Sequence, residues 1–123
     1  MERFSSGCNC CQAVVTAFCK DYDVPEPIAM HMGSAFGGGM RRKEVCGAVT
    51  GALMALGMKY GPGSVDDKKA KETANAKTAE YMAEFEQRHG SYLCRDLRGK
   101  NSRGESCSEL VAGAASLLEE FGV

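Results

Sequence analysis

The sequence has 123 residues, and its 15 Lys and Arg against 16 Asp and Glu give a formal net charge of −1. This length predicts one compact domain over residues 1–123, and the 44% hydrophobic and 25% charged residues exclude disordered and fibrous classes. Because there is no basic surplus to neutralise phosphates, nucleic acid is not an expected partner. The uncharged stretch of residues 46–58 is shorter than the about 20 residues of a membrane span, so no membrane association is expected.

Three helices are predicted in the first half of the chain. The first covers residues 6–22 with Ser5 or Ser6 as N-cap, and its core-facing residues are Cys11, Val14, Val15, Phe18 and Cys19. The second begins near Asp23 and Glu26, which have the spacing of a capping box, and its expected apolar side consists of Ile28, Met32 and Phe36. The third covers residues 42–60, and one face carries Cys46, Val49, Leu53 and Leu56.

The second half predicts a long helix over residues 64–89, a short helical turn over 92–97 and a last helix from Ser106. Ser106 and Glu109 form a capping box, and the stripe behind them consists of Cys107, Leu110, Val111, Ala114, Leu118 and Phe121. The charged segment 64–71 and the polar loop 99–104 are expected to be the least protected. Because no segment alternates apolar and polar residues, the predicted fold is an all-α bundle of about five to six helices.

Seven cysteines are the unusual feature of the composition. An odd number excludes a fully disulfide-paired framework, and the first eight residues lack the apolar core of a signal peptide. We therefore expect a cytoplasmic location. In a reducing compartment, clustered cysteines favour metal ligation or redox chemistry over structural disulfides.

Cys8 and Cys11 form a Cys-x-x-Cys motif at the start of the first predicted helix. One interpretation is a thiol-disulfide oxidoreductase in which these two are the attacking and resolving thiols, although the βαβ pattern of thioredoxin-like enzymes is missing. The other is that Cys8 is exposed and Cys11 is a small core residue. Gln12 stands where covalent attachment of c-type haem requires His, so no covalent haem is expected.

Four further cysteine positions suggest a shared site. Cys46 and Cys107 lie near helix starts, where the helix dipole stabilises a thiolate. If the cysteines of four segments face one core, they supply a single site with four thiols: Cys10, Cys46, Cys94 and Cys107. Of these we expect Cys94, beside the polar loop, to be the most accessible. The alternative is a non-catalytic helical interaction module with inert buried cysteines.

Several segments together resemble the C_GCAxxG_C_C family of redox-active proteins, over almost the whole chain. They are Phe4 with residues 7–10, residues 36–40, residues 44–57, and the isolated Cys94 and Cys107. The resemblance implies Cys10, Cys46, Cys94 and Cys107 as motif cysteines, with Gly47, Ala48 and Gly51 as tight-packing partners. Gly47 separates Cys46 from Ala48, whereas the family pattern places Cys directly before Ala. The resemblance implies no substrate.

The expected site is therefore an iron–sulfur or zinc centre or a reversible disulfide, and no catalytic residue is assigned. A redox partner protein and a homo-oligomer are both compatible with the sequence. Two other groups have plainer explanations: Met30, His31 and Met32 fit core packing better than copper binding, and His89 suits a helix C-terminus. Residues 37–39, followed by the basic residues 41–43, fit a turn, with a small anionic ligand near Cys46 as the alternative.

Overall fold

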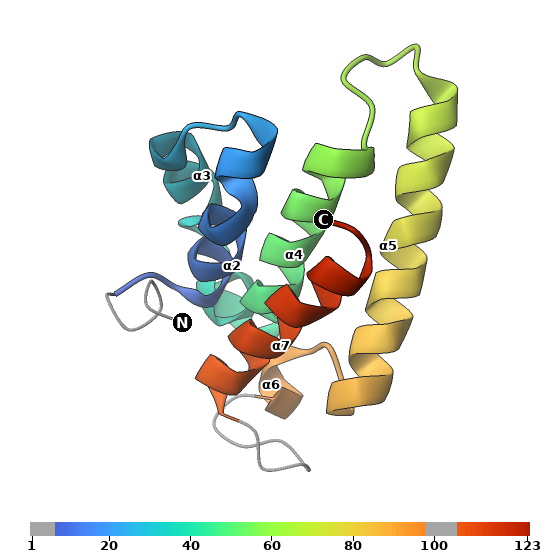
Figure 1. The fold of residues 1–123 in the computed structure, drawn as a ribbon. Helices are drawn as coiled ribbons and strands as arrows, with labels where there is room; N and C mark the ends of the chain where they lie inside the picture. The colour runs from blue at the N-terminus through green and yellow to red at the C-terminus, as the bar shows by residue number, and fades with distance from the viewer. Residues whose placement is uncertain (1–6, 98–105) are drawn as a thin grey trace.

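The computed structural model describes residues 7–97 and 106–123, and Figure 1 shows these residues folded into helices. The elements are α2 (Cys10–Phe18), the 3-10 helix η1 (Cys19–Tyr22), α3 (Glu26–Gly33), the π-type turn η2 (Gly39–Lys43), α4 (Gly47–Tyr60), α5 (Lys68–His89), α6 (Cys94–Leu97) and α7 (Cys107–Glu120). In these ranges the β-structure is limited to an isolated antiparallel bridge between Val45 and Leu93. The all-α prediction is confirmed. None of the described helices combines the length and apolar character needed to cross a membrane.

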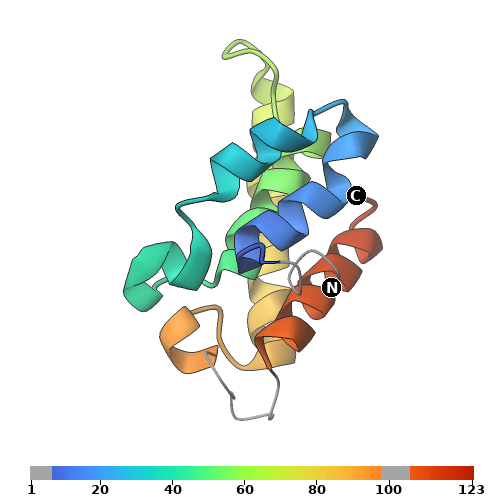
Figure 2. The same ribbon diagram turned by 90° about the vertical axis from the view of Figure 1, so that its left-hand side faces the viewer.

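Glycines bring α2 and α4 into close contact. A Cβ atom at Gly51 would lie 2.6 Å from the Cys11 carbonyl oxygen, and one at Gly47 would lie 3.1 Å from Cys10 Cβ. Any larger side chain would therefore push the two helices apart. Figure 2 shows α2 lying across the start of α4. The predicted role of Gly47 and Gly51 in helix packing is confirmed.

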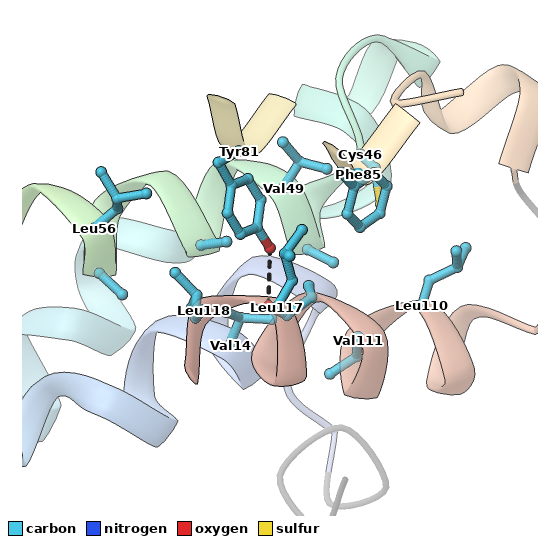
Figure 3. Packing of buried hydrophobic residues seen from close by; sticks show 14 of the residues in the cluster. Val14, Cys46, Val49, Leu56, Tyr81, Phe85, Leu110, Val111, Leu117 and Leu118 are labelled. Atoms are coloured by element: carbon cyan, nitrogen blue, oxygen red, sulfur yellow. Dashed lines mark hydrogen bonds between the residues drawn. The ribbon is translucent and has the colours of Figure 1, made fainter. Parts of the chain in front are cut away.

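The main core lies between α4, α5 and α7 and is centred on aromatic residues of α5 (Figure 3). Tyr81 is fully buried, and its hydroxyl donates a hydrogen bond of 2.8 Å to the Ala114 carbonyl oxygen of α7. Phe85 is also fully buried one turn later. Because a buried hydroxyl without a partner would be costly, this bond fixes α7 against α5 in one register.

The first helix begins later than the sequence pattern suggested. Asn9 is its N-cap: the side chain accepts from the Gln12 backbone N–H, and the Gln12 side chain accepts from the Asn9 N–H. This reciprocal box replaces the expected cap at Ser5 or Ser6, which lie outside the described residues. The predicted core face is confirmed, because all five of its residues are buried: Cys11, Val14, Val15, Phe18 and Cys19.

The prediction of which side of the second helix, α3, is buried is wrong. Ile28 and Met32 are 49% and 52% exposed, whereas Ala29 is fully buried. The reason is the contact with α2: a Cβ atom at Gly33 would lie 3.1 Å from Gln12 Cγ. The small residues of α3 therefore face α2, which turns the larger ones toward solvent, so core packing does not account for Met32.

The long helix also starts later than expected. α5 begins at Lys68, and its cap is Asp67, whose side chain accepts from the Ala70 N–H, rather than Ser64. Residues 62–69 are exposed, as expected for a charged segment without an apolar stripe. The capping box of Ser106 and Glu109 at α7 is confirmed. The polar loop 99–104 lies outside the described residues.

The glycine contact predicts opposite effects for the same substitution at two sites on α4. Gly51→Ala should lower the free energy of unfolding by about 1 to 3 kcal/mol, because the added methyl overlaps the Cys11 carbonyl. Gly57→Ala is the matched control: nothing lies within 4 Å of its Cβ position, so it should stabilise by up to about 1 kcal/mol through helix propensity. Denaturant unfolding measures both, and stabilisation by Gly51→Ala would contradict the packing argument.

Exposure along the chain predicts a gradient of amide hydrogen exchange. Segment 64–71 should exchange fast, because it buries little apolar surface, whereas segments 47–56 and 110–118 should exchange slowly as part of the main core. Exchange followed by mass spectrometry checks this order. Equal protection of these three segments would be inconsistent with it.

Candidate functional site

Four cysteines distant in sequence line one cavity of about 250 Å³: Cys10, Cys46, Cys94 and Cys107. Cys10, Cys94 and Cys107 are the first residues of α2, α6 and α7, and Cys46 is the N-cap residue of α4. The starts of these four helices lie in the lower half of the view in Figure 1. The sequence pattern predicts Cys46 and Cys107 near helix starts and places Cys8 and Cys11 at the start of the first helix. The structure shows that α2 begins at Cys10, after the cap at Asn9, and that Cys94 also begins a helix.

The β-bridge positions two of the four cysteines. Cys46 and Cys94 each directly follow a bridged residue. The Cys46 N–H donates to the Tyr92 carbonyl oxygen at 2.7 Å, and the Cys94 N–H donates to the Glu44 carbonyl oxygen at 2.6 Å. These two backbone bonds hold the start of α4 beside the start of α6 and so bring both thiols to the same cavity.

Glycine backbone forms much of the cavity wall. Gly39 has φ of +63°, and a Cβ atom there would lie 2.7 Å from Cys94 Cβ and 2.6 Å from the Glu44 backbone nitrogen. Gly38 and Gly47 also line the cavity. The other lining residues are Asn9, Leu97 and Leu110. A side chain at Gly39 or Gly47 would overlap the backbone and the cysteine against which that glycine packs, so glycine lets these segments approach closely around the cavity.

The order of exposure differs from the expectation. Cys46 and Cys94 are buried, at 5% and 8% exposure, while Cys10 and Cys107 are half-buried. The prediction that Cys94 is the most accessible of the four is wrong. Cys94 is buried because Gly39 packs against its Cβ atom and because its backbone N–H bonds to the Glu44 carbonyl oxygen. Solvent therefore reaches the cavity from the side of α2 and α7.

Burial dominates the acidity of these thiols. Loss of solvation, followed by the neighbouring thiols of Cys46, Cys107 and Cys94 in that order, raises the pKa of Cys10 to about 12. Burial also raises the pKa of Cys46, although the N–H groups of Ala48 and Val49 act in the opposite direction. The expected thiolate stabilisation by the helix start is present at Cys46, but desolvation outweighs it.

The remaining cysteines lie outside the cavity. Cys8 Sγ contacts Met30 Sδ at 3.9 Å, and the fully buried Cys11 has its Sγ 3.9 Å from Met54 Sδ. Burial raises the pKa of Cys11. The Cys8 and Cys11 thiols thus pack against different helices, α3 and α4, an arrangement that fits the core-residue interpretation of Cys11 better than a working redox pair. Cys19 donates to the Thr16 carbonyl oxygen at 3.4 Å.

All seven cysteines lie in the described ranges, and none of them forms a disulfide there. Within those ranges, no three His, Cys, Asp or Glu side chains are arranged to hold a metal ion. The four thiols line one shared space. His89 packs against Phe85, with ring centroids 4.4 Å apart, and is not a lining residue of the cavity.

The fold and the cavity define an all-α protein in which four cysteines line one cavity. The family model described as "Putative redox-active protein (C_GCAxxG_C_C)" matches residues 8–121. The chain belongs to this family. No curated protein and no solved structure matches the chain.

The raised pKa of Cys10 predicts slow alkylation of this thiol in the full chain when it is free of metal. Raising the pKa from 9.0 to about 12 keeps this thiol protonated near pH 8. The small fraction of Cys10 that is thiolate is more nucleophilic than an ordinary cysteine thiolate, because nucleophilicity rises with pKa. The rate of reaction with iodoacetamide should therefore fall by roughly one to two orders of magnitude. Because folding favours the protonated thiol of Cys10, its thiolate fraction grows up to the raised pKa. The alkylation rate of Cys10 should therefore keep rising between pH 9 and pH 12.

Peptide mapping after timed alkylation measures this rate, and the denatured chain gives the reference for an ordinary thiol. Equal rates for Cys10 in the folded and denatured chain would contradict the burial of this thiol.

Proposed function

We propose that the protein is an electron carrier whose four cavity thiols, Cys10, Cys46, Cys94 and Cys107, ligate an iron–sulfur cluster. The observation that supports this proposal is the cavity itself, which four cysteines from four helix starts line together. Cys₄ ligation is the usual donor set of such clusters. When bound, a cluster of this kind supplies one-electron transfer.

The size of the cavity favours a cluster over a single zinc ion. Zinc needs four sulfurs about 2.3 Å from one centre, and the described thiols have no such arrangement. A volume of about 250 Å³ is several times the roughly 30 Å³ that one water molecule occupies in the liquid. Cluster ligands bind different iron atoms, so they must stand around a volume, as these four do.

The acidity of Cys10 favours metal ligation over disulfide exchange. A thiol with a pKa of about 12 holds little thiolate at neutral pH and attacks a disulfide slowly. A metal instead displaces the proton and compensates the charges of the crowded sulfurs, which otherwise raise the pKa of one another. The reversible disulfide is therefore the second candidate for this cavity.

The chain's own residues tune and protect the site. The N–H groups of Ala48 and Val49 bond the Cys46 sulfur and so favour its anionic form. Leu97 and Leu110 supply the apolar part of the lining and limit the entry of water. Hydrogen bonds to sulfur and solvent exposure are the two main controls of cluster potential. The half-exposed side at Cys10 and Cys107 is where a redox partner protein would approach in the cytoplasm.

The test is anaerobic purification followed by visible absorption, iron and acid-labile sulfide analysis. We expect iron and sulfide bound to the chain, and loss of most of both in each single variant, Cys10→Ser, Cys46→Ser, Cys94→Ser and Cys107→Ser. Cys19→Ser is the matched control, since a serine can keep the bond to Thr16 and the site lies outside the cavity. It should retain the full iron content.

Other outcomes identify the rivals. A colourless protein with stoichiometric zinc would replace the cluster with a zinc site. Absence of metal with the loss of two free thiols on oxidation would establish the disulfide, and mapping would separate the cavity cysteines from Cys8 and Cys11. If no metal is bound and all seven thiols are unreactive, the non-catalytic helical interaction module is the interpretation that remains.

A further inference from the structure

A second hollow lies directly beside the thiol cavity. It has a volume of about 270 Å³ and is lined by Asn9, Gly37, Gly38, Arg41 and Lys43. Asn9 and Gly38 also line the thiol cavity, so the two spaces share a wall. We name this second hollow the basic pocket.

The charges of the basic pocket are not compensated. Within residues 7–97 and 106–123, Arg41 and Lys43 make no ion pair, whereas Arg88 and Arg95 bind carboxylates in the same ranges. Glu44, the carboxylate next to them in sequence, is bound by Arg95 at 2.7 Å. Two cations on one concave surface repel each other, and an anion between them would remove this repulsion.

The backbone holds these cations in a strained conformation. Arg41 and Lys43 have φ of +64° and +57°, and Met40 between Gly39 and Arg41 has +59°. Left-handed backbone costs roughly 1 to 2 kcal/mol for each residue with a side chain. Strain of this kind persists where the surroundings fix it, and it is concentrated at functional sites. Here it directs two basic residues to one pocket.

The shared wall is rigid. The Asn9 side chain donates to the carbonyl oxygens of Gly33 and Ser34 at 3.1 and 3.3 Å and accepts from the Gln12 N–H. A Cβ atom at Gly37 would lie 2.7 Å from Asn9 Cβ, so only glycine fits against Asn9 at this position of the pocket lining. A ligand in the basic pocket would therefore contact a rigid wall, formed by Asn9 and Gly38, that also lines the thiol cavity.

We propose that the basic pocket binds the anionic group, phosphate or carboxylate, of a small molecule whose remaining atoms lie past Asn9 and Gly38, at the edge of the thiol cavity. A role of this molecule as one-electron donor or acceptor to the cluster would rest on the proposed function, whereas the binding of the anion does not. A pocket of this size fits one oxyanion group with a short extension, and so selects a small molecule instead of the flat acidic surface of a protein.

Calorimetric titration of the purified full chain with inorganic phosphate, and separately with acetate, tests the anion site. We expect one saturable site and about tenfold or more weaker binding in the double variant Arg41→Gln, Lys43→Gln. The matched control is Lys68→Gln, Lys69→Gln, which removes the same charge from the exposed start of α5 and should leave binding unchanged. Tighter binding of phosphate or of acetate shows whether the pocket prefers a phosphate or a carboxylate group.

A charged and a neutral alkylating reagent, applied to the full chain freed of metal, test the connection to the thiols. Iodoacetate carries a carboxylate and iodoacetamide does not; in both, the thiolate sulfur forms a bond to carbon and iodide leaves. Relative to their rate ratio in the denatured chain, iodoacetate should be favoured severalfold at Cys10 or Cys107. Phosphate should compete for this advantage, and the Arg41 and Lys43 double variant should lose it.

Three outcomes would overturn the proposal. They are no saturable binding of phosphate or acetate, equal weakening in both double variants, and anion binding without a preference for iodoacetate at the cavity thiols. Binding of a polyglutamate peptide alone would assign the basic residues to an acidic partner protein and also overturn it. Iron content of the same preparations reports on the cluster separately, so failure of one idea is distinguishable from failure of the other.

Discussion

The close contact between α2 and α4 is the constraint on which the four-thiol cavity depends. Gly47 and Gly51 present bare backbone to Cys10 and Cys11, and two helices can approach this closely only where one of them carries no side chain at the crossing. The contact brings the start of α2 beside the start of α4. Helix packing thereby places the Cys10 thiol beside Cys46.

The other two thiols depend on different forces. Cys94 is held by backbone hydrogen bonds to the segment before α4, and Cys107 by the capping box that starts α7 and the Tyr81 bond that fixes its register. Four helix starts thus meet around one space. Their dipoles favour negative charge there by typically 0.3 to 1 kcal/mol each, while removal of a thiolate from water costs more. The raised pKa values of Cys10 and Cys46 record this balance.

The sequence is informative where a feature depends on neighbours within one helix. Periodicity predicts the buried face of α2, and the Ser106 and Glu109 spacing predicts the start of α7. Prediction fails where the partner is remote. Ile28 and Met32 face solvent because Gly33 meets Gln12, and Cys94 is covered because Gly39 lies against it. The cavity-lining Leu97 and Leu110 carry no local signal that separates them from other core leucines. The Asn9 and Gln12 spacing is the one readable sign of the α2 start.

The bridge between Val45 and Leu93 has a consequence for the way the protein is made. It closes a loop that contains all of α4 and α5, and contacts between such distant segments form late in folding. Cys107 lies further on, in the last helix. While the ribosome is still extending the chain, Cys10 and Cys46 have emerged but Cys94 and Cys107 have not joined them. The nascent protein therefore exposes two early thiols without the remaining pair, and the complete set is assembled only after Cys107 has been synthesised.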